Sequence, residues 1–187
     1  NLIDIIPSNK VKNHAYKNQD GLKFKSFDDS GLQTPSFSNG SAYGDLDNDG
    51  DLDLIVNNVN MPVFVYKNTL DTVSSNFIKI DLKRNALNKF AIGSKVEVIL
   101  PDGNSLFQEV QPARGFQSSV DIRPNFGLGN IEQFDLKVTW PDRSVTNLEN
   151  IKSNQILKIY QSESNIYNDI NNFYPLSIVF ENIDGIV

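Results

Sequence analysis

The chain has 187 residues, 39% of them hydrophobic, which is enough for one good-sized domain or two small ones with a packed core. Its net charge of −6 and its singly scattered Lys and Arg residues argue against nucleic acid and anionic membrane surfaces as partners. The absence of cysteine excludes disulfides, thiolate catalysis and cysteine-ligated zinc. No apolar run approaches the roughly 20 residues of a membrane-spanning helix, so we expect no membrane span.

The first 72 residues contain short strand-like runs rather than helical periodicity. Alternating or apolar runs occur in HAYKN, LKFKSF, LIVNN and VFVYKN, at residues 14–18, 22–27, 54–58 and 63–68. Turn-forming Asn, Gly, Pro and Ser separate them. The chain opens at Asn1 without a signal segment, and we expect a trimmed fragment of a longer parent chain.

An acidic loop lies between two of these strands and reads DLDNDGDLD over residues 45–53. Calcium takes six to eight oxygen ligands, and alternate side chains of a tightly wound loop converge on one point. We therefore predict a calcium site in which Asp51 contributes its backbone carbonyl and the side chains of four residues bind the ion, namely Asp45, Asp47, Asp49 and Asp53. Gly50 stands where such a loop must turn sharply. Val56 at the twelfth position, in place of Glu, excludes an EF-hand.

Charge supports the same interpretation, because no Lys or Arg lies between residues 38 and 66 to neutralise these acids. Carboxylates held close together raise one another's pKa, and a divalent cation relieves that repulsion. The alternative is a metal-free, Asp-rich turn between two strands.

The segment NGSAYGDLDNDGDLDLIVNN, residues 39–58, resembles the FG-GAP or VCBS repeat of integrin-type β-propellers. The resemblance covers residues 14–68. It implies that the loop joins two strands of a blade and holds calcium for stability.

From residue 73 onward, period-2 strands are predicted at 77–83, 95–100, 134–140 and 155–160. In the first, Ile78 and Ile80 face one way and Lys79 the other, which indicates a half-buried antiparallel strand. VEVILPDGNS and LKVTWPDRS, which start at residues 96 and 136, form a weak internal repeat in which a strand runs into a Pro-Asp turn. Two similar hairpins should therefore build a small antiparallel β-sandwich or barrel-like module over residues 73–161.

This second region is similar to the ASPIC/UnbV domain in four blocks: FAIGSKVEV, QPARGFQSS, FGLGN and VTWPD. Such domains follow FG-GAP propellers in secreted bacterial proteins, and the order here is the same. The family's Gly-Tyr pair stands here as Gly115-Phe116. No catalytic activity is established by this resemblance, so it gives none to carry over to this chain.

A loop at residues 111–119 is the candidate ligand site. Arg114 offers a planar donor fork, Gly115 allows close backbone approach, and Phe116 offers an apolar face to a sugar or an anion. The same loop could instead pin two sheets together. Both readings stay open on the sequence alone.

The sequence offers no convincing set of catalytic residues. His14 is the only histidine, so no Ser-His-Asp or Cys-His arrangement exists around a second one. Four acids could in principle supply a pair of glycosidase carboxylates. However, Asp102 and Asp142 are explained by their turns, and Glu97 and Glu109 fit the polar faces of half-exposed strands.

The sequence thus predicts an all-β, calcium-binding, non-enzymatic fragment of a secreted or cell-surface bacterial protein. It comprises a propeller-blade segment at 1–72, the ASPIC/UnbV module at 73–161, and a linker with the start of another segment at 162–187. We expect binding or adhesion to an extracellular protein or glycan, besides contacts with the rest of the parent chain. Extracytoplasmic localisation follows from the millimolar calcium available there. The alternatives are an accessory part of a polysaccharide-handling enzyme and a purely structural spacer.

Overall fold

The computed structural model describes residues 9–69, 75–115 and 118–161. Within these ranges the chain forms twelve strands and one short 3₁₀ helix, η2 (Asp28–Ser30), with no α-helix. The predicted all-β class is therefore confirmed. No helix in the described ranges has the length and apolar character needed to cross a membrane. The expected linker and following segment at 162–187 lie outside the described residues.

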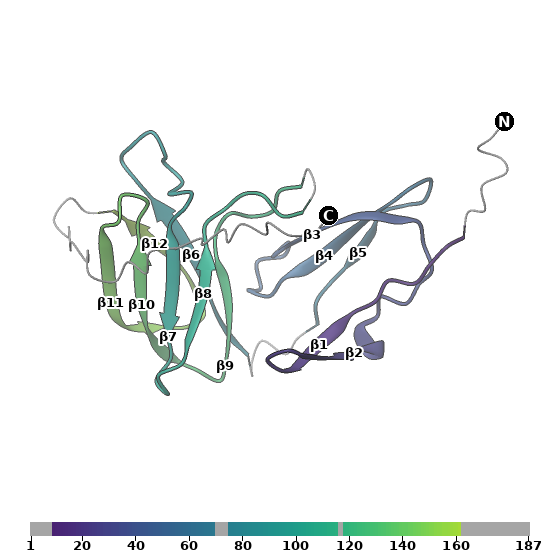
Figure 1. Ribbon diagram of the computed structural model, residues 1–187, viewed down its shortest axis with the longest axis horizontal. Coiled ribbons are helices and arrows are strands. Elements are labelled where there is room, and N and C mark those ends of the chain that lie inside the picture. The colour runs from purple at the N-terminus through teal and green to yellow at the C-terminus, as the bar shows by residue number, and fades with distance from the viewer. Residues whose placement is uncertain (1–8, 70–74, 116–117, 162–187) are drawn as a thin grey trace, which may run out of the picture.

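The N-terminal strands form two small antiparallel sheets, drawn in purple and blue in Figure 1. The first is the hairpin of β1 (Tyr16–Asp20) and β2 (Lys23–Ser26). The second is the meander of β3 (Ser38–Gly44), β4 (Asp53–Asn58) and β5 (Phe64–Tyr66). Gly44 pairs with Asp53 in this meander, so the acidic loop connects two adjacent antiparallel strands, as expected from the sequence.

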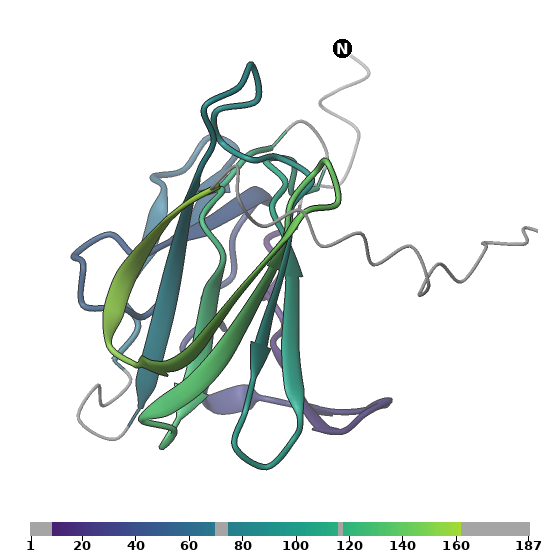
Figure 2. The same ribbon diagram turned by 90° about the vertical axis from the view of Figure 1, so that its left-hand side faces the viewer.

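Seven later strands form two further sheets at the other end of the molecule (Figures 1 and 2). The larger has the order β11-β10-β7-β8 and the smaller the order β12-β6-β9. Their bounds are β6 Asn76–Lys83, β7 Lys95–Ile99, β8 Ser105–Glu109, β9 Asn125–Gly129, β10 Gln133–Thr139, β11 Val145–Lys152 and β12 Gln155–Tyr160. All four strands predicted in this region are present.

The predicted internal repeat corresponds to the hairpins β7–β8 and β10–β11. Both turns use the same bonds, because the side chain of Asp102 accepts from the amide of Asn104 and that of Asp142 accepts from the amide of Ser144. Gly103 and Arg143 have φ of 85° and 73° at equivalent turn positions. The left-handed conformation explains the Gly in the first turn.

The core lies between these two sheets and draws apolar side chains from both. Ile78 and Ile80 of β6, Val96 and Val98 of β7, and Val138 of β10 are fully buried. Burying one such side chain contributes about 1.5–3 kcal/mol, so this set is the main source of stability in the second half of the chain.

The prediction for β6 needs two corrections. β6 pairs antiparallel with β9 but parallel with β12, which lies along its other edge. Its polar face is also not open to solvent along its whole length, since Lys79 is only 2% exposed. The N-terminal half of the chain covers that position.

Candidate metal centre and adjoining cleft

The acidic loop is held at both ends by the β3–β4 pairing and bends at two residues of positive φ. Asn48 has φ of 61° and Gly50 has φ of 97°. Asn tolerates the left-handed region, and glycine enters it without a Cβ clash. The sharp turn expected at Gly50 is therefore present.

Three predicted ligands converge. Carboxylate oxygens of Asp45, Asp47 and Asp49 all lie within 4.8 Å of one another. Oxygens at that mutual separation suit a hard divalent cation, whose ligand distances are about 2.3–2.6 Å for calcium. This convergence is what the alternate spacing of the acids in a tightly wound loop predicted.

The two remaining acids have different surroundings. Asp53 is 3% exposed, and its carboxylate accepts hydrogen bonds from the amides of Leu46 at 3.0 Å and Asn68 at 2.9 Å. It thereby fixes the ends of the loop. Both carboxylate oxygens of Asp51 are shielded from solvent and have no hydrogen-bond partner within the described chain. Burial, with the negative charges of Asp49, Asp53 and Asp47, raises the pKa of Asp51 to about 6.

Lysines from beyond the loop neutralise part of its charge, which local sequence inspection did not anticipate. Lys67 contacts Asp47 and lies 3.8 Å from Asp49. This contact lowers the pKa of Asp47 and raises that of Lys67, chiefly through the hydrogen bond between the two side chains. Both groups are largely exposed, so solvent screens the attraction.

Lys79 is the second compensating cation and is buried. Its ammonium lies 2.5 Å from Oδ2 of Asp45, and the two side chains are 2% and 3% exposed. The other oxygen of Asp45, Oδ1, is buried without a partner in the described residues. One carboxylate oxygen is therefore tied to β6, and the other remains available to a cation in the loop.

Two further contacts join the loop to the second half of the chain. A Cβ added at Gly50 would lie 2.1 Å from the ring of Phe77, so the backbone and this ring are in close contact. The side chain of Asn125 donates to the carbonyl of Gly50 at 3.3 Å. With the ion pair of Lys79, these contacts make the loop part of the interface between β3–β5 and β6–β12.

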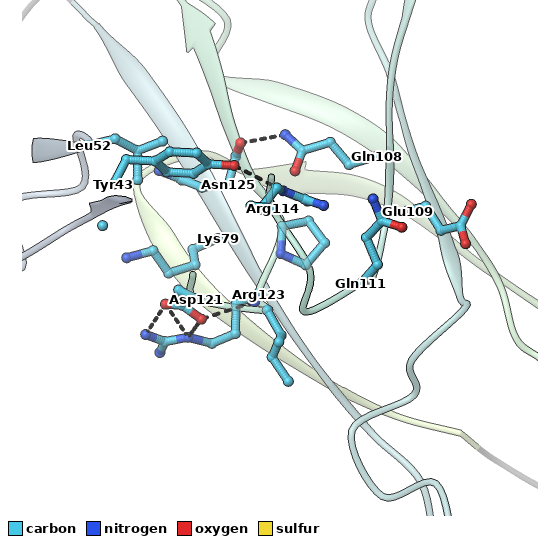
Figure 3. Close-up of a pocket in the computed structure, with 13 residues that line it drawn as sticks. Tyr43, Leu52, Lys79, Gln108, Glu109, Gln111, Arg114, Asp121, Arg123 and Asn125 are labelled. Carbon is cyan, nitrogen blue, oxygen red and sulfur yellow. Dashed lines mark hydrogen bonds and ion pairs between the residues drawn. The ribbon is translucent and has the colours of Figure 1, made fainter. Parts of the chain in front are cut away.

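A cleft of about 280 Å³ adjoins this interface (Figure 3). Tyr43 and Gly44 line it from β3, Gln108 and Glu109 from β8, and Arg114 from the β8–β9 connection. Lys79 and the ion pair of Asp121 and Arg123 also line it. The cleft thus brings together residues from both halves of the chain.

Arg114, singled out from the sequence, lies in this cleft. Its Nε donates to the hydroxyl of Tyr43 at 3.1 Å and its Nη1 to the carbonyl of Ala113 at 3.2 Å. Gly115 has φ of 76° and open space around a would-be Cβ, so backbone conformation accounts for the glycine. Phe116 lies outside the described residues, and its predicted role stays a prediction.

The fold and the loop define an all-β protein with a candidate metal-binding loop joined to a seven-stranded module. Residues 84–166 match the family described as ASPIC and UnbV, in agreement with the second resemblance. The chain is also similar to cartilage acidic protein 1 of Xenopus tropicalis, at 29% identity over 109 residues, which are 57% of this chain and 16% of that protein. For the same protein of Mus musculus the values are 28% over 147 residues, 73% of this chain and 22% of the relative. The chain therefore spans about a fifth of the length of the curated relatives it matches.

Proposed function

We propose that this chain is a calcium-stabilised, non-catalytic binding module of a secreted or cell-surface protein. The observation that carries the proposal is the set of three converging carboxylates beside buried oxygens of Asp45 and Asp51 that have no hydrogen-bond partner among the described residues. Buried carboxylate oxygens without donors are costly, and a cation supplies what they lack.

The donor set fits calcium. Asp45, Asp47 and Asp49 would hold the ion. Asp51 would contribute as well, because it belongs to the same acidic loop and its buried carboxylate oxygens have no hydrogen-bond partner in the described chain. Asp53, also expected from the sequence to be a ligand, accepts hydrogen bonds from the amides of Leu46 and Asn68, and its part in binding the ion stays a prediction. Calcium in such a loop would supply charge compensation and rigidity. The ligand count of the loop and the FG-GAP resemblance support calcium over magnesium, which prefers to keep its water.

Calcium in this position would do more than hold one turn. The loop contacts Phe77, Lys79 and Asn125 of the second half of the chain. A rigid loop would therefore hold the β3–β5 meander in a fixed position against the module and preserve the cleft between them. Binding to an extracellular glycan or protein at that cleft is the function this arrangement supports best. Millimolar calcium outside the cytoplasm would keep a loop of modest affinity occupied.

Thermal unfolding in EDTA and in excess calcium tests the proposal. We expect about 2.7 kcal/mol of added stability at calcium concentrations a hundredfold above Kd. Asp47→Ala should abolish most of this increment, whereas Asp29→Ala, an exposed acid outside the loop, should retain it. Identical melting curves with EDTA and calcium for the unmodified chain would refute the metal site.

A further inference from the structure

The cleft between β3 and the β8–β9 connection has a distinct charge pattern. Three cations line it, and two have carboxylate partners: Lys79 pairs with Asp45, and Arg123 pairs with Asp121 at 2.5 Å. Arg114 has no ion pair within the described residues. Glu109 also lines the cleft, but its carboxylate points away from Arg114 (Figure 3). One positive charge in the cleft is thus left uncompensated.

The guanidinium of Arg114 is held in place before any ligand arrives. Tyr43 accepts from Nε and the carbonyl of Ala113 accepts from Nη1, and Nη2 makes no hydrogen bond in the described part of the chain. The amide of Arg114 also donates to the carbonyl of Ser118 at 2.9 Å, which fixes the backbone of Arg114 within the β8–β9 connection. A fixed planar guanidinium with an available edge suits a carboxylate, which it can bind through two parallel bonds.

The other walls of the cleft offer hydroxyl partners and an aromatic face. Gln108 donates through Nε2 to the carbonyl of Asn125 at 2.7 Å, which fixes the amide and leaves Oε1 as an acceptor. Gln111 makes no hydrogen bond among the described residues and lines the same space. Tyr43 is 42% exposed, so part of its ring is accessible. Amide groups beside an aromatic ring suit a ligand that carries hydroxyls on an otherwise apolar ring.

We propose that this cleft binds a small carboxylated sugar of the size of a hexuronic acid. The carboxylate lies against Arg114, hydroxyls bond to Gln108 and Gln111, and a sugar face packs on Tyr43. A volume of about 280 Å³ suits one monosaccharide unit rather than a long chain buried along its length. A single uncompensated cation favours a monoanion over a phosphate dianion. This inference gives a ligand class to the binding function proposed above and rests on it.

The test is an NMR titration of the full chain with D-glucuronate, with D-glucose and acetate as separate probes. We expect saturable amide shifts at Gly44, Gln111 and Arg114 with glucuronate and much weaker binding of the other two. Equal binding of glucose and glucuronate would overturn the role of the carboxylate. Equal binding of acetate would overturn the sugar class, and the absence of any saturable shift would overturn the site.

Variants assign the binding to these residues. Arg114→Gln should weaken glucuronate binding by about tenfold or more, as expected for the loss of a charge-assisted bond. Tyr43→Phe keeps the ring but frees Nε and should weaken binding less. Arg143→Gln removes the same charge from an exposed turn away from the cleft and should leave binding unchanged. Unaltered affinity in Arg114→Gln, with the variant folded by its amide spectrum, would overturn the proposal.

Performing the titration in calcium and in EDTA separates this inference from the metal site. Glucuronate shifts that persist when calcium gives no stabilisation would refute only the calcium proposal. Calcium stabilisation without glucuronate shifts would refute only the ligand assignment.

Discussion

The ammonium of Lys79 lies 2.5 Å from Oδ2 of Asp45, and this ion pair is almost fully buried between the acidic loop and β6. The two residues are 34 positions apart. The pair therefore connects the candidate calcium site to the central strand of the smaller sheet of the module, at the face opposite the core.

Replacing Lys79 with Met should destabilise the calcium-free protein by about 3–5 kcal/mol, because Asp45 would keep a buried charge without its partner. Calcium should recover part of this loss by neutralising the same carboxylate. Urea denaturation followed by circular dichroism, in EDTA and in calcium, measures both effects. The double variant Asp45→Asn/Lys79→Met should be less destabilised than the two single changes added together. A single variant as stable as the unmodified protein in EDTA would contradict the role of the pair.

Lys67→Gln should tighten calcium binding, since Lys67 places a positive charge beside Asp47 and Asp49. The lysine is 62% exposed, so solvent screens its charge and the change in Kd should be no more than a few-fold. Isothermal titration calorimetry at low ionic strength measures this change. Lys89→Gln, at an exposed position outside the acidic loop, serves as the control for net charge. Weaker binding in Lys67→Gln would show that the lysine supports the site instead of competing with calcium.

Gly50→Ala should destabilise the protein through two separate effects. The left-handed conformation costs an L-residue about 1–2 kcal/mol, and the new methyl group overlaps the ring of Phe77, at a cost of roughly 1–3 kcal/mol. Gly31→Ala is the matched control, because Gly31 has φ of 76° but open space around its Cβ. Differential scanning calorimetry should show the larger loss for Gly50→Ala. Equal losses would mean that Phe77 does not pack against the loop.

Titration of the Asp142 carboxyl should make the stability of the module depend on pH. Burial raises the pKa of this carboxyl, but hydrogen bonds from Ser144 and Gln161 and the charge of Arg84 outweigh that effect and hold the pKa below its usual value. A folded-state pKa below the unfolded value stabilises the protein above about pH 4. That stability is lost as the pH falls through the folded-state pKa.

Urea midpoints of the unmodified chain and Asp142→Asn should therefore differ at pH 7 and converge towards pH 3. Asp29→Asn, at an exposed acid, is the comparison for a charge change away from this network. Trp140 is the sole tryptophan and is 2% exposed near the same turn, so its fluorescence reports on unfolding of the module. A difference between the variant and the unmodified chain that does not change with pH would contradict the titration of Asp142.

A fragment of residues 76–161 should fold without the N-terminal strands, because the core cluster is drawn from this range alone. Lys79 would simply become hydrated in that fragment. Residues 9–69 should not fold alone, since only Val56 among their hydrophobic side chains is buried in the described chain. Amide dispersion in two-dimensional NMR spectra distinguishes the cases. A dispersed spectrum for 9–69 with a collapsed one for 76–161 would reverse this assignment.

Local sequence patterns determined much of the architecture. Period-2 alternation placed β6, β7, β10 and β12 because one face of each must meet an apolar core. The Pro-Asp turns placed two hairpins because the side chain of Asp bonds the backbone two residues further on. The alternating acids of the loop predicted the convergence of Asp45, Asp47 and Asp49. This contact is also local, because all three residues belong to one tightly wound loop.

Only the tertiary structure decided what lies across from each face. The parallel pairing of β12 with β6, the burial of Lys79 against Asp45, and the bond from Arg114 to Tyr43 join residues that are tens of positions apart. No local periodicity encodes such contacts, because they depend on how whole sheets stack and on where each loop is carried. From the sequence, a lysine on the polar side of a strand is expected to be exposed to solvent. Lys79 is buried because the acidic loop packs over it.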